Sequence, residues 1–587
     1  MKIKLFIYAN VMNNFLLTKI LLFGLLLIGI LIVGCSNSHL IKIPPAVPDD
    51  RNHVPEPKSV RIHPYGEYFE KQVIMPIGNF VDLSRQYRKL TGTRKEAINV
   101  DAFGEVSNSS WFTNRNAHKR MSLEEIARGP NTGFGPDTSN VWIVTRAKAE
   151  GVTPGFTIKD IKGDSYVLKF DPVGYPELAS GPEVVSTKLF YAMGYNTPEN
   201  YLVLFNPNIL QLGEEVKFTD KKGRNRIMNE QDLQEILSNI EKLPNGRIRA
   251  VASKYLEGVP IGPFTYEGVR KDDLNDFIPH QHRRELRGLR IIAAWLNHFD
   301  TKDGNTLDMY VTENGKSYVK HYLIDFGATL GSASTQPNYL WRGHQYDVDP
   351  GVIIANIFTL GLYVRPWEKQ EGLKYPSAGI FDAELFNPMK YKALVPNPAF
   401  LNTTLLDGYW AAKIVMSLTD EQLKTAIKQG QYSEPEAEEF LLQTVIKRRN
   451  KIGEYFFHRL NPLDCFTIQV DDKGNNLLSF KDLAVETGLE SKEETEYKYQ
   501  VRLISENEKR FLDERHIHSN HISFKEFEDK LYREFSPQNQ NYGDCQVEIS
   551  IQTNRNEKEE WSKPVKVYLS LVQEGKQFEL ITIKRET

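Results

Sequence analysis

Short runs of β-branched and aromatic residues, separated by turn-forming residues, first give the chain a regular pattern after residue 140. These runs predict five strands, at 141–145, 156–159, 165–170, 201–205 and 248–255. The first three follow one another so closely that they predict an antiparallel meander. A polar insert near 229–242 separates the last two strands and is expected to be helical. The region 81–255 is therefore expected to be an N-terminal extension followed by a strand-rich lobe.

Apolar residues at helical spacing dominate the region 256–462. The clearest helix is expected at 283–297, and 406–460 is expected to form three helical pieces. Arg283, Arg287 and Arg290 lie on a different face from the apolar positions of the first helix, and that face is expected to be solvated. This region is therefore expected to be a helical lobe.

A helix is also expected from Ser180 onward, between the third and fourth strands. Ser180 and Glu183 have the spacing of a capping box, in which a serine side chain and a glutamate side chain satisfy the first backbone amides. Apolar residues follow at helical spacing, and Gly194 is expected to end the helix.

Residues 463–587 change to an alternation of polar and apolar positions. The alternation is clearest at 546–552, 566–571 and 579–583, which predicts strands with one buried face. We expect a separate β-sandwich of immunoglobulin or fibronectin type here. The whole chain is thus predicted to be α+β, with a strand-rich lobe, a helical lobe and a C-terminal all-β sandwich.

Composition narrows the class of protein. The chain has 587 residues, 40% of them apolar and 25% charged, which is ordinary for folded soluble domains. Its formal net charge is −3, so no overall basic field predicts a nucleic-acid partner. Only three cysteines are present, which excludes a scaffold built on many disulfides.

The N-terminus carries the features of an export signal. Lysines precede an uncharged apolar run at 20–34, and the run ends at Cys35. This resembles a bacterial lipobox, which implies cleavage after residue 34 and lipidation of Cys35. The protein would then be anchored to a membrane of the cell envelope, and the serine at position 36 favours the outer membrane. The alternative is an uncleaved anchor helix. Residues 35–80 contain several prolines and are expected to be a tether.

Two motifs in the helical lobe carry the candidate chemistry. His298 and Asp300 are followed after four residues by Asn305, and Asp325-Phe326-Gly327 follows a short apolar strand. Both patterns resemble the catalytic loop and metal-binding motif of the protein-kinase-like superfamily. The surrounding sequence resembles its atypical members, namely HipA-type, CotH-type and phosphoinositide-kinase-like enzymes. The resemblance covers roughly residues 140–460.

The resemblance implies a role for each of these side chains in phosphoryl transfer from ATP with Mg²⁺. Asp300 would accept the proton of the attacking hydroxyl group, and Asn305 and Asp325 would hold the metal ion. The acceptor substrate is not indicated. The spacing between Asn305 and Asp325 is longer than in typical protein kinases.

The strand-rich lobe would supply the nucleotide site. By the same resemblance, Lys169 would contact the phosphates, Glu183 would pair with Lys169, and backbone amides near Gly151 and Gly155 would cover the phosphates. Tyr255 lies where the adenine-binding segment is expected. The complete glycine series of typical protein kinases is missing.

Each of these residues also has a simpler structural interpretation. His298 could cap a helix C-terminus, and the polar residues after it could form only a turn. Lys169 could be an exposed strand residue, while Glu183 could serve only the capping box. The chain could therefore be an active kinase-like enzyme, a pseudokinase that binds a partner, or a structural envelope protein.

Cys465 and Cys545 both fall in the expected β-sandwich. An exported location would permit a disulfide between them, and two separate buried thiols are the alternative.

Overall fold

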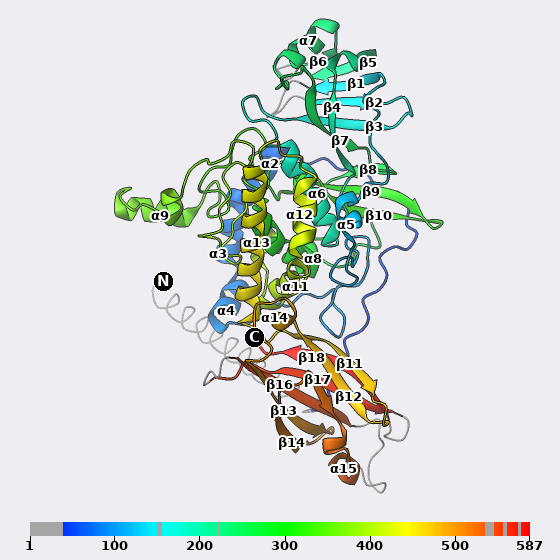
Figure 1. Ribbon diagram of the computed structural model, residues 1–587, viewed down its shortest axis with the longest axis vertical. Helices are drawn as coiled ribbons and strands as arrows, with labels where there is room; N and C mark the ends of the chain where they lie inside the picture. The colour runs from blue at the N-terminus through cyan, green and yellow to red at the C-terminus, as the bar shows by residue number, and fades with distance from the viewer. Residues whose placement is uncertain (1–38, 149–154, 220–223, 535–544, 556–559, 573–576) are drawn as a thin grey trace, which may run out of the picture.

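The computed structural model describes residues 39–148, 155–219, 224–534, 545–555, 560–572 and 577–587. The described chain is a mixed α/β structure with several sheets. In Figure 1 the largest sheet lies at one end, helices occupy the middle, and the C-terminal strands lie at the other end. The apolar run at 20–34 and Cys35 lie outside the described residues, as does Gly151.

A seven-stranded sheet forms the first unit. In sheet order its strands are β4 (Asn200–Phe205), β7 (Ile248–Lys254), β3 (Ser165–Phe170), β2 (Gly155–Lys159), β1 (Trp142–Lys148), β5 (Leu210–Thr219) and β6 (Asn225–Ile227). The five predicted strands are confirmed. Strands β5 and β6 were not expected, because much of their sequence is polar and exposed. Helix α7 (Glu230–Ser238) lies in the predicted insert and shares an apolar core with one face of this sheet.

The second unit is helical. Its main helices are α6 (Ser180–Ala192), α8 (Arg284–Leu296), α11 (Leu405–Met416), α12 (Asp420–Lys428) and α13 (Pro435–Phe457), with short α5 (Leu123–Arg128) and α10 (Pro398–Leu401) at its edge. Apolar side chains from all of them form one core. The predicted helix at 283–297 and the three pieces at 406–460 are confirmed.

The arginine face of α8 is not solvated, so that prediction is wrong. Arg287 has no exposed surface and pairs with Asp407 of α11 at 3.2 Å, while Arg283 is 2% exposed and pairs with Asp276 at 3.4 Å. Asp407 lies far along the chain, so the helical pattern around the arginines could not reveal it. Arg290 instead donates to backbone carbonyl groups of residues 389, 391 and 400.

A hairpin of β9 (Thr306–Glu313) and β10 (Lys316–Leu323) follows the long helix α8 and pairs with β8 (Val259–Gly262). It accounts for the long spacing between Asn305 and Asp325, because Asn305 immediately precedes β9 and only Ile324 separates the end of β10 from Asp325. The two motifs are therefore at the two ends of one hairpin and lie side by side.

The C-terminal region contains two antiparallel sheets that share one apolar core. One sheet has β11 (Leu463–Val470), β12 (Asn476–Asp482) and β15 (His521–Ser523), and the other has β14 (Lys509–Ile517), β13 (Thr495–Ile504), β16 (Gln546–Arg555), β17 (Val565–Val572) and β18 (Gln577–Arg585). The region is not all-β, because α14 (Leu483–Glu486) and α15 (Lys525–Glu534) interrupt the strands. No disulfide joins Cys465 to Cys545, although the sequence permitted one, and the alternative of two separately buried thiols holds for Cys545 alone. Cys465 is exposed on β11, whereas Cys545 lies in the apolar core.

Residues 64–80, which proline content assigned to a tether, are instead helical. Helix α2 (Pro64–Phe69) continues through a π-helical turn (Glu70–Ile74) into α3 (Met75–Val81), and α4 (Leu83–Thr91) follows. The tether prediction is wrong there, because Glu67 and Lys71 turn inward and are buried. None of the described helices has both the length and the apolar character that crossing a membrane requires.

Candidate active site

Lys169 joins two carboxylates from different parts of the chain. Its Nζ atom lies 3.0 Å from Glu183 Oε1 on α6 and 3.0 Å from Asp325 Oδ1 after β10. Burial alone would lower the pKa of Lys169, but the two carboxylates outweigh it and raise that pKa. The structure thus brings together three predicted site residues from the strand-rich and helical units.

The placement of Glu183 depends on Asp171, two residues beyond Lys169. Asp171 Oδ1 accepts hydrogen bonds from the amides of Ala179 and Ser180 at 2.9 and 2.8 Å, at the start of α6. The capping box predicted between Ser180 and Glu183 is wrong, because Ser180 Oγ donates instead to Asp171 Oδ2 at 2.7 Å. Asp171 therefore fixes the helix carrying Glu183 to the strand carrying Lys169, and leaves Glu183 available for pairing.

Glu183 is 2% exposed and is held from a second side. Asn200 Nδ2, at the start of β4, donates to Glu183 Oε1 at 3.0 Å. Burial raises the pKa of Glu183 even though Lys169 opposes this effect. The other carboxylate oxygen, Oε2, is buried and has no hydrogen-bond partner among the described residues. A buried, unpartnered carboxylate oxygen is costly unless a cation or a donor approaches it.

Asp325 occupies a left-handed backbone conformation, with φ of +65°. Such a conformation is uncommon outside glycine and is retained where surrounding structure holds it. The lysine beside it lowers the pKa of Asp325. Its neighbour Phe326 has no exposed surface, stacks on Phe190 of α6 with ring centroids 4.8 Å apart, and packs against His298 at 5.7 Å. These aromatic contacts fix the turn that carries Asp325 to the helix that carries Glu183.

Asp300 and Asn305 form the second part of the site. Asn305 Nδ2 donates to the backbone oxygen of Asp300 at 2.8 Å and to its Oδ2 at 3.0 Å. Lys302 Nζ also lies 3.0 Å from Asp300 Oδ2. Asp300 Oδ1 is buried and has no hydrogen-bond partner in the described chain. The backbone amide of Ile324, next to Asp325, donates to Asn305 O at 3.1 Å, which links the two motifs directly.

The third residue of interest, His298, is buried at the start of this loop. It is 4% exposed, and burial lowers the pKa of its imidazole. Its Nδ1 atom lies 3.4 Å from Ala328 O, and the hydroxyl of Tyr391 donates to its backbone oxygen at 2.6 Å. The imidazole of His298 therefore packs against the loop and does not cap α8, although the backbone amide of His298 donates to Ala293 O of that helix at 2.8 Å.

Some contributors were not found in the sequence. Lys302 had a local signal, because it stands between Asp300 and Asn305. Glu67 and Lys71 had no local signal in the sequence. In the structure, Glu67 Oε1 accepts a hydrogen bond from the amide of Asp303 at 2.6 Å, and Lys71 Nζ lies 3.3 Å from Asp303 Oδ2. The N-terminal helices thus support the loop from more than 200 residues away.

The remaining predicted positions lie on the sheet. Gly155 begins β2 and is the direct cross-strand partner of Lys169. Gly151 belongs to the preceding loop, outside the described residues. Tyr255 follows β7, four positions beyond Val251, the β7 partner of Lys169. Its hydroxyl lies 3.4 Å from Thr157 Oγ1. Tyr255 therefore stands at the far end of the same sheet and not beside the ionic cluster.

No three His, Cys, Asp or Glu side chains gather as a metal site anywhere in the described residues. Mg²⁺ is commonly bound by one or two carboxylates together with substrate phosphates and water, so such an ion does not need a cluster of this kind. Asp325 and Asn305 could hold such an ion, and the unpartnered oxygens of Asp300 and Glu183 leave negative charge for a cation or a hydroxyl donor.

Comparisons with known proteins add little to this geometry. No protein-family model matches the sequence, and no curated protein matches it. A crystal structure of the Golgi casein kinase aligns with 70% of this chain and 96% of its own, at 12% identity and a TM-score of 0.25. A second structure of the Golgi casein kinase, with Mn/ADP bound, aligns with 57% of this chain and 75% of its own, at 12% identity and a TM-score of 0.23. Such low TM-scores do not establish a shared fold.

Proposed function

We propose that this protein is an atypical kinase-like phosphotransferase that uses a nucleoside triphosphate and a divalent metal ion. The observation that carries the proposal is the position of Lys169, which contacts Glu183 and Asp325 at 3.0 Å each. In this interpretation the seven-stranded sheet and the helical unit are the two lobes of one enzyme. ATP and Mg²⁺ are the proposed nucleotide and metal.

Each described side chain has a chemical task in this proposal. Lys169 places a positive charge where phosphate oxygens would lie, and Glu183 and Asp325 keep that charge in position. Asp325 and Asn305 are the residues that would hold the metal ion. When bound, the ion neutralises negative charge on the phosphates. Gly155, directly opposite Lys169, lets the backbone approach the phosphates closely.

The acceptor side of the reaction is assigned to Asp300. Its Oδ2 is held by Asn305 and Lys302, whereas its Oδ1 accepts no hydrogen bond within the described chain. A carboxylate with one oxygen fixed and the other available is suited to receive the proton of an attacking hydroxyl group. Lys302 would hold Asp300 in place and add positive charge beside the transferred phosphoryl group.

Turnover of ATP tests this proposal. The protein is incubated with ATP and Mg²⁺ or Mn²⁺, and loss of the γ-phosphate is followed by ³¹P NMR. We expect slow, metal-dependent loss in the wild type and none in the Asp300→Asn variant. Equal rates in both proteins would contradict the assignment of Asp300. Nucleotide binding without turnover under all conditions would favour the second candidate, a pseudokinase that binds a partner.

We further propose that the protein works at a bacterial envelope membrane, anchored through a lipid on Cys35, with the outer membrane favoured. Exposed apolar residues support work at a membrane surface. Helix α9 (Pro350–Thr359) projects from the helical unit (Figure 1), and it exposes Ile354, Ile357 and Phe358. Intact-mass analysis tests the anchor, because a Cys35→Ser variant should lose both the lipid and the cleavage. Normal processing of that variant would rule the anchor out.

A further inference from the structure

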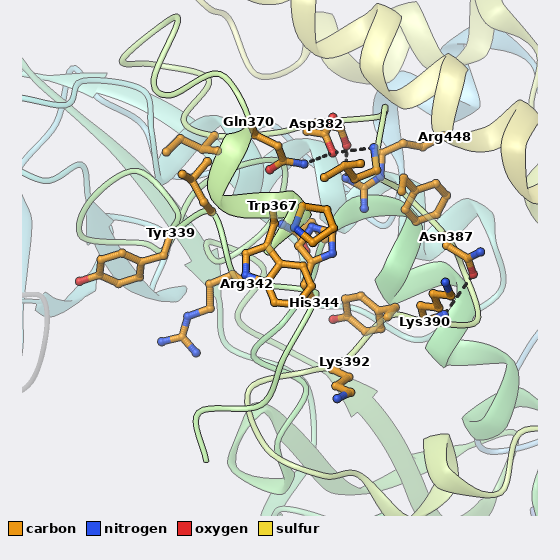
Figure 2. Close-up of a pocket in the computed structure, with 18 of the residues that line it drawn as sticks. Tyr339, Arg342, His344, Trp367, Gln370, Asp382, Asn387, Lys390, Lys392 and Arg448 are labelled. Carbon is orange, nitrogen blue, oxygen red and sulfur yellow. Dashed lines mark hydrogen bonds between the residues drawn. The ribbon is translucent and has the colours of Figure 1, made fainter. Parts of the chain in front are cut away.

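A separate cavity of about 500 Å³ lies between the end of α8 and the segment 339–392. Figure 2 shows Arg448 of α13 and Lys390 and Lys392 of the loop segment around this space, with Arg342 on another side. The cavity also reaches Asn297, just before the candidate catalytic loop. Its volume would accommodate a small molecule.

Arg448 is the most informative residue of the cavity, because it is buried without a matching acid. It is 6% exposed, and no Asp or Glu forms an ion pair with it in the described part of the chain. Its two terminal nitrogens donate to the backbone oxygens of Asp382 and Ala294 at 2.6 and 2.7 Å. Its Nε atom is buried and has no hydrogen-bond partner among the residues that the structure describes. Burial lowers the pKa of Arg448 to about 9.

The nearest acid is already engaged. Asp382 Oδ2 accepts from Gln370 Nε2 at 2.7 Å, and its Oδ1 accepts from the amide of Glu384 at 2.6 Å. The guanidinium of Arg448 instead lies over the ring of Phe386, 4.1 Å from the centroid. A buried arginine with an open donor is an unfavourable arrangement by itself, and a bound anion would relieve it.

A second arginine of the same cavity also lacks an acidic partner. Arg290 donates only to backbone carbonyl groups, and within the described residues it pairs with no acid. Burial lowers its pKa. His344 and Trp367 also line the cavity, and their rings stack on each other with centroids 5.2 Å apart and planes at 6°. Exposed Lys390 adds positive charge at the rim.

We propose that this cavity binds a small anionic molecule through an oxyanion group, a phosphate or a carboxylate, which pairs with Arg448. The stacked rings of His344 and Trp367 offer an aromatic face to a planar or ring portion of the same ligand. The proposal does not depend on phosphoryl transfer at Lys169 and Asp325, so either can fail without the other.

Isothermal titration calorimetry on the full chain in detergent tests the site, with inorganic phosphate and benzoate as probes and chloride as the constant background anion. We expect saturable binding of at least one probe. Arg448→Gln should weaken it at least about tenfold, because it removes a charge-assisted contact. Lys390→Gln should weaken it by about two- to fivefold, because a rim charge contributes less. Lys447→Gln is the matched control, since Lys447 is the exposed neighbour on α13 outside the cavity lining.

The variants separate the outcomes. Should Arg448→Gln fail to fold, as judged by circular dichroism, Lys390→Gln compared with Lys447→Gln still decides the question. Asp325→Asn should bind phosphate and benzoate like the wild type, which distinguishes this cavity from the proposed nucleotide site. The proposal is overturned if neither probe binds saturably, or if both lysine variants change binding equally.

Discussion

Replacing Lys169 by methionine removes the only charge that joins Glu183 to Asp325 among their described contacts. The variant keeps most of the side-chain volume, so its effect is mainly electrostatic. The contact between Lys169 and Asp325 is partly open to solvent, with side-chain exposures of 33% and 49%. It therefore contributes at most about 1 kcal/mol to the free energy of unfolding. The Glu183 carboxylate is only 2% exposed. Leaving it without the positive charge of Lys169 therefore destabilises the protein more than losing the contact with Asp325 does.

The magnitude follows from these exposures. Removing one partner of a fully buried ion pair costs about 3–5 kcal/mol. Lys169 is one-third exposed, and in the variant Asn200 still donates to Glu183. We therefore expect the Lys169→Met substitution to lower the free energy of unfolding by about 2–3 kcal/mol at pH 8. The pH dependence has a definite sign. Burial raises the folded-state pKa of Glu183, so its penalty grows as pH rises through that pKa and is smallest where the carboxyl group is protonated.

The effect of Lys169→Met on stability is measured at pH 5 and pH 8 in two ways. One is the rate of amide hydrogen exchange in β3 and α6, and the other is the midpoint temperature of thermal unfolding. We expect the Lys169→Met variant to open more readily at pH 8 than at pH 5. Adding Glu183→Gln should recover about 1–2 kcal/mol, because the buried group is then neutral and can still accept from Asn200. Additive destabilisation in the double variant, or a loss independent of pH, would refute this reasoning.

Three further predictions follow from the same region and the C-terminal sheets. Phe326→Ala removes a fully buried ring and should destabilise by about 3–5 kcal/mol, measured by urea unfolding, with faster exchange in α6; unchanged exchange there would refute the coupling through this ring. Asp171→Ala removes the cap of α6 and should lower the free energy of unfolding by about 1–2 kcal/mol, again measured by urea unfolding. An unchanged free energy of unfolding would mean that the cap does not stabilise the helix. In a Cys35→Ser chain, thiol titration should show Cys465 reacting in the folded protein and Cys545 reacting only after unfolding; oxidation of both in fresh protein would contradict the structure.

Local periodicity was sufficient to predict the elements that carry the site. Lys169 stands in a strand of alternating burial, and Asp325 lies two residues after a hairpin whose second strand was expected. The spacing of Asp300 and Asn305 also predicted their proximity, which the structure shows as a hydrogen bond. These features depend on residues close together in sequence, so the sequence pattern contains them.

Long-range contacts could not be read in this way. Arg287 of α8 looked solvated because its acidic partner Asp407 is 120 residues away. The cap of α6 was assigned to Ser180, although Asp171 provides it across a loop. The helical segment that carries Glu67 looked like a tether, because no local pattern shows that it is bound to Asp303.

The most direct test of the central claim is calorimetric titration of the full chain with ADP in the presence and absence of Mg²⁺. Asp325→Asn is the informative variant, because asparagine tolerates the positive φ of this position while lacking the charge. The account predicts saturable, metal-dependent binding by the wild type, and loss of the metal dependence in Asp325→Asn. Absence of binding by the wild type, or identical metal-dependent binding by both proteins, would contradict it.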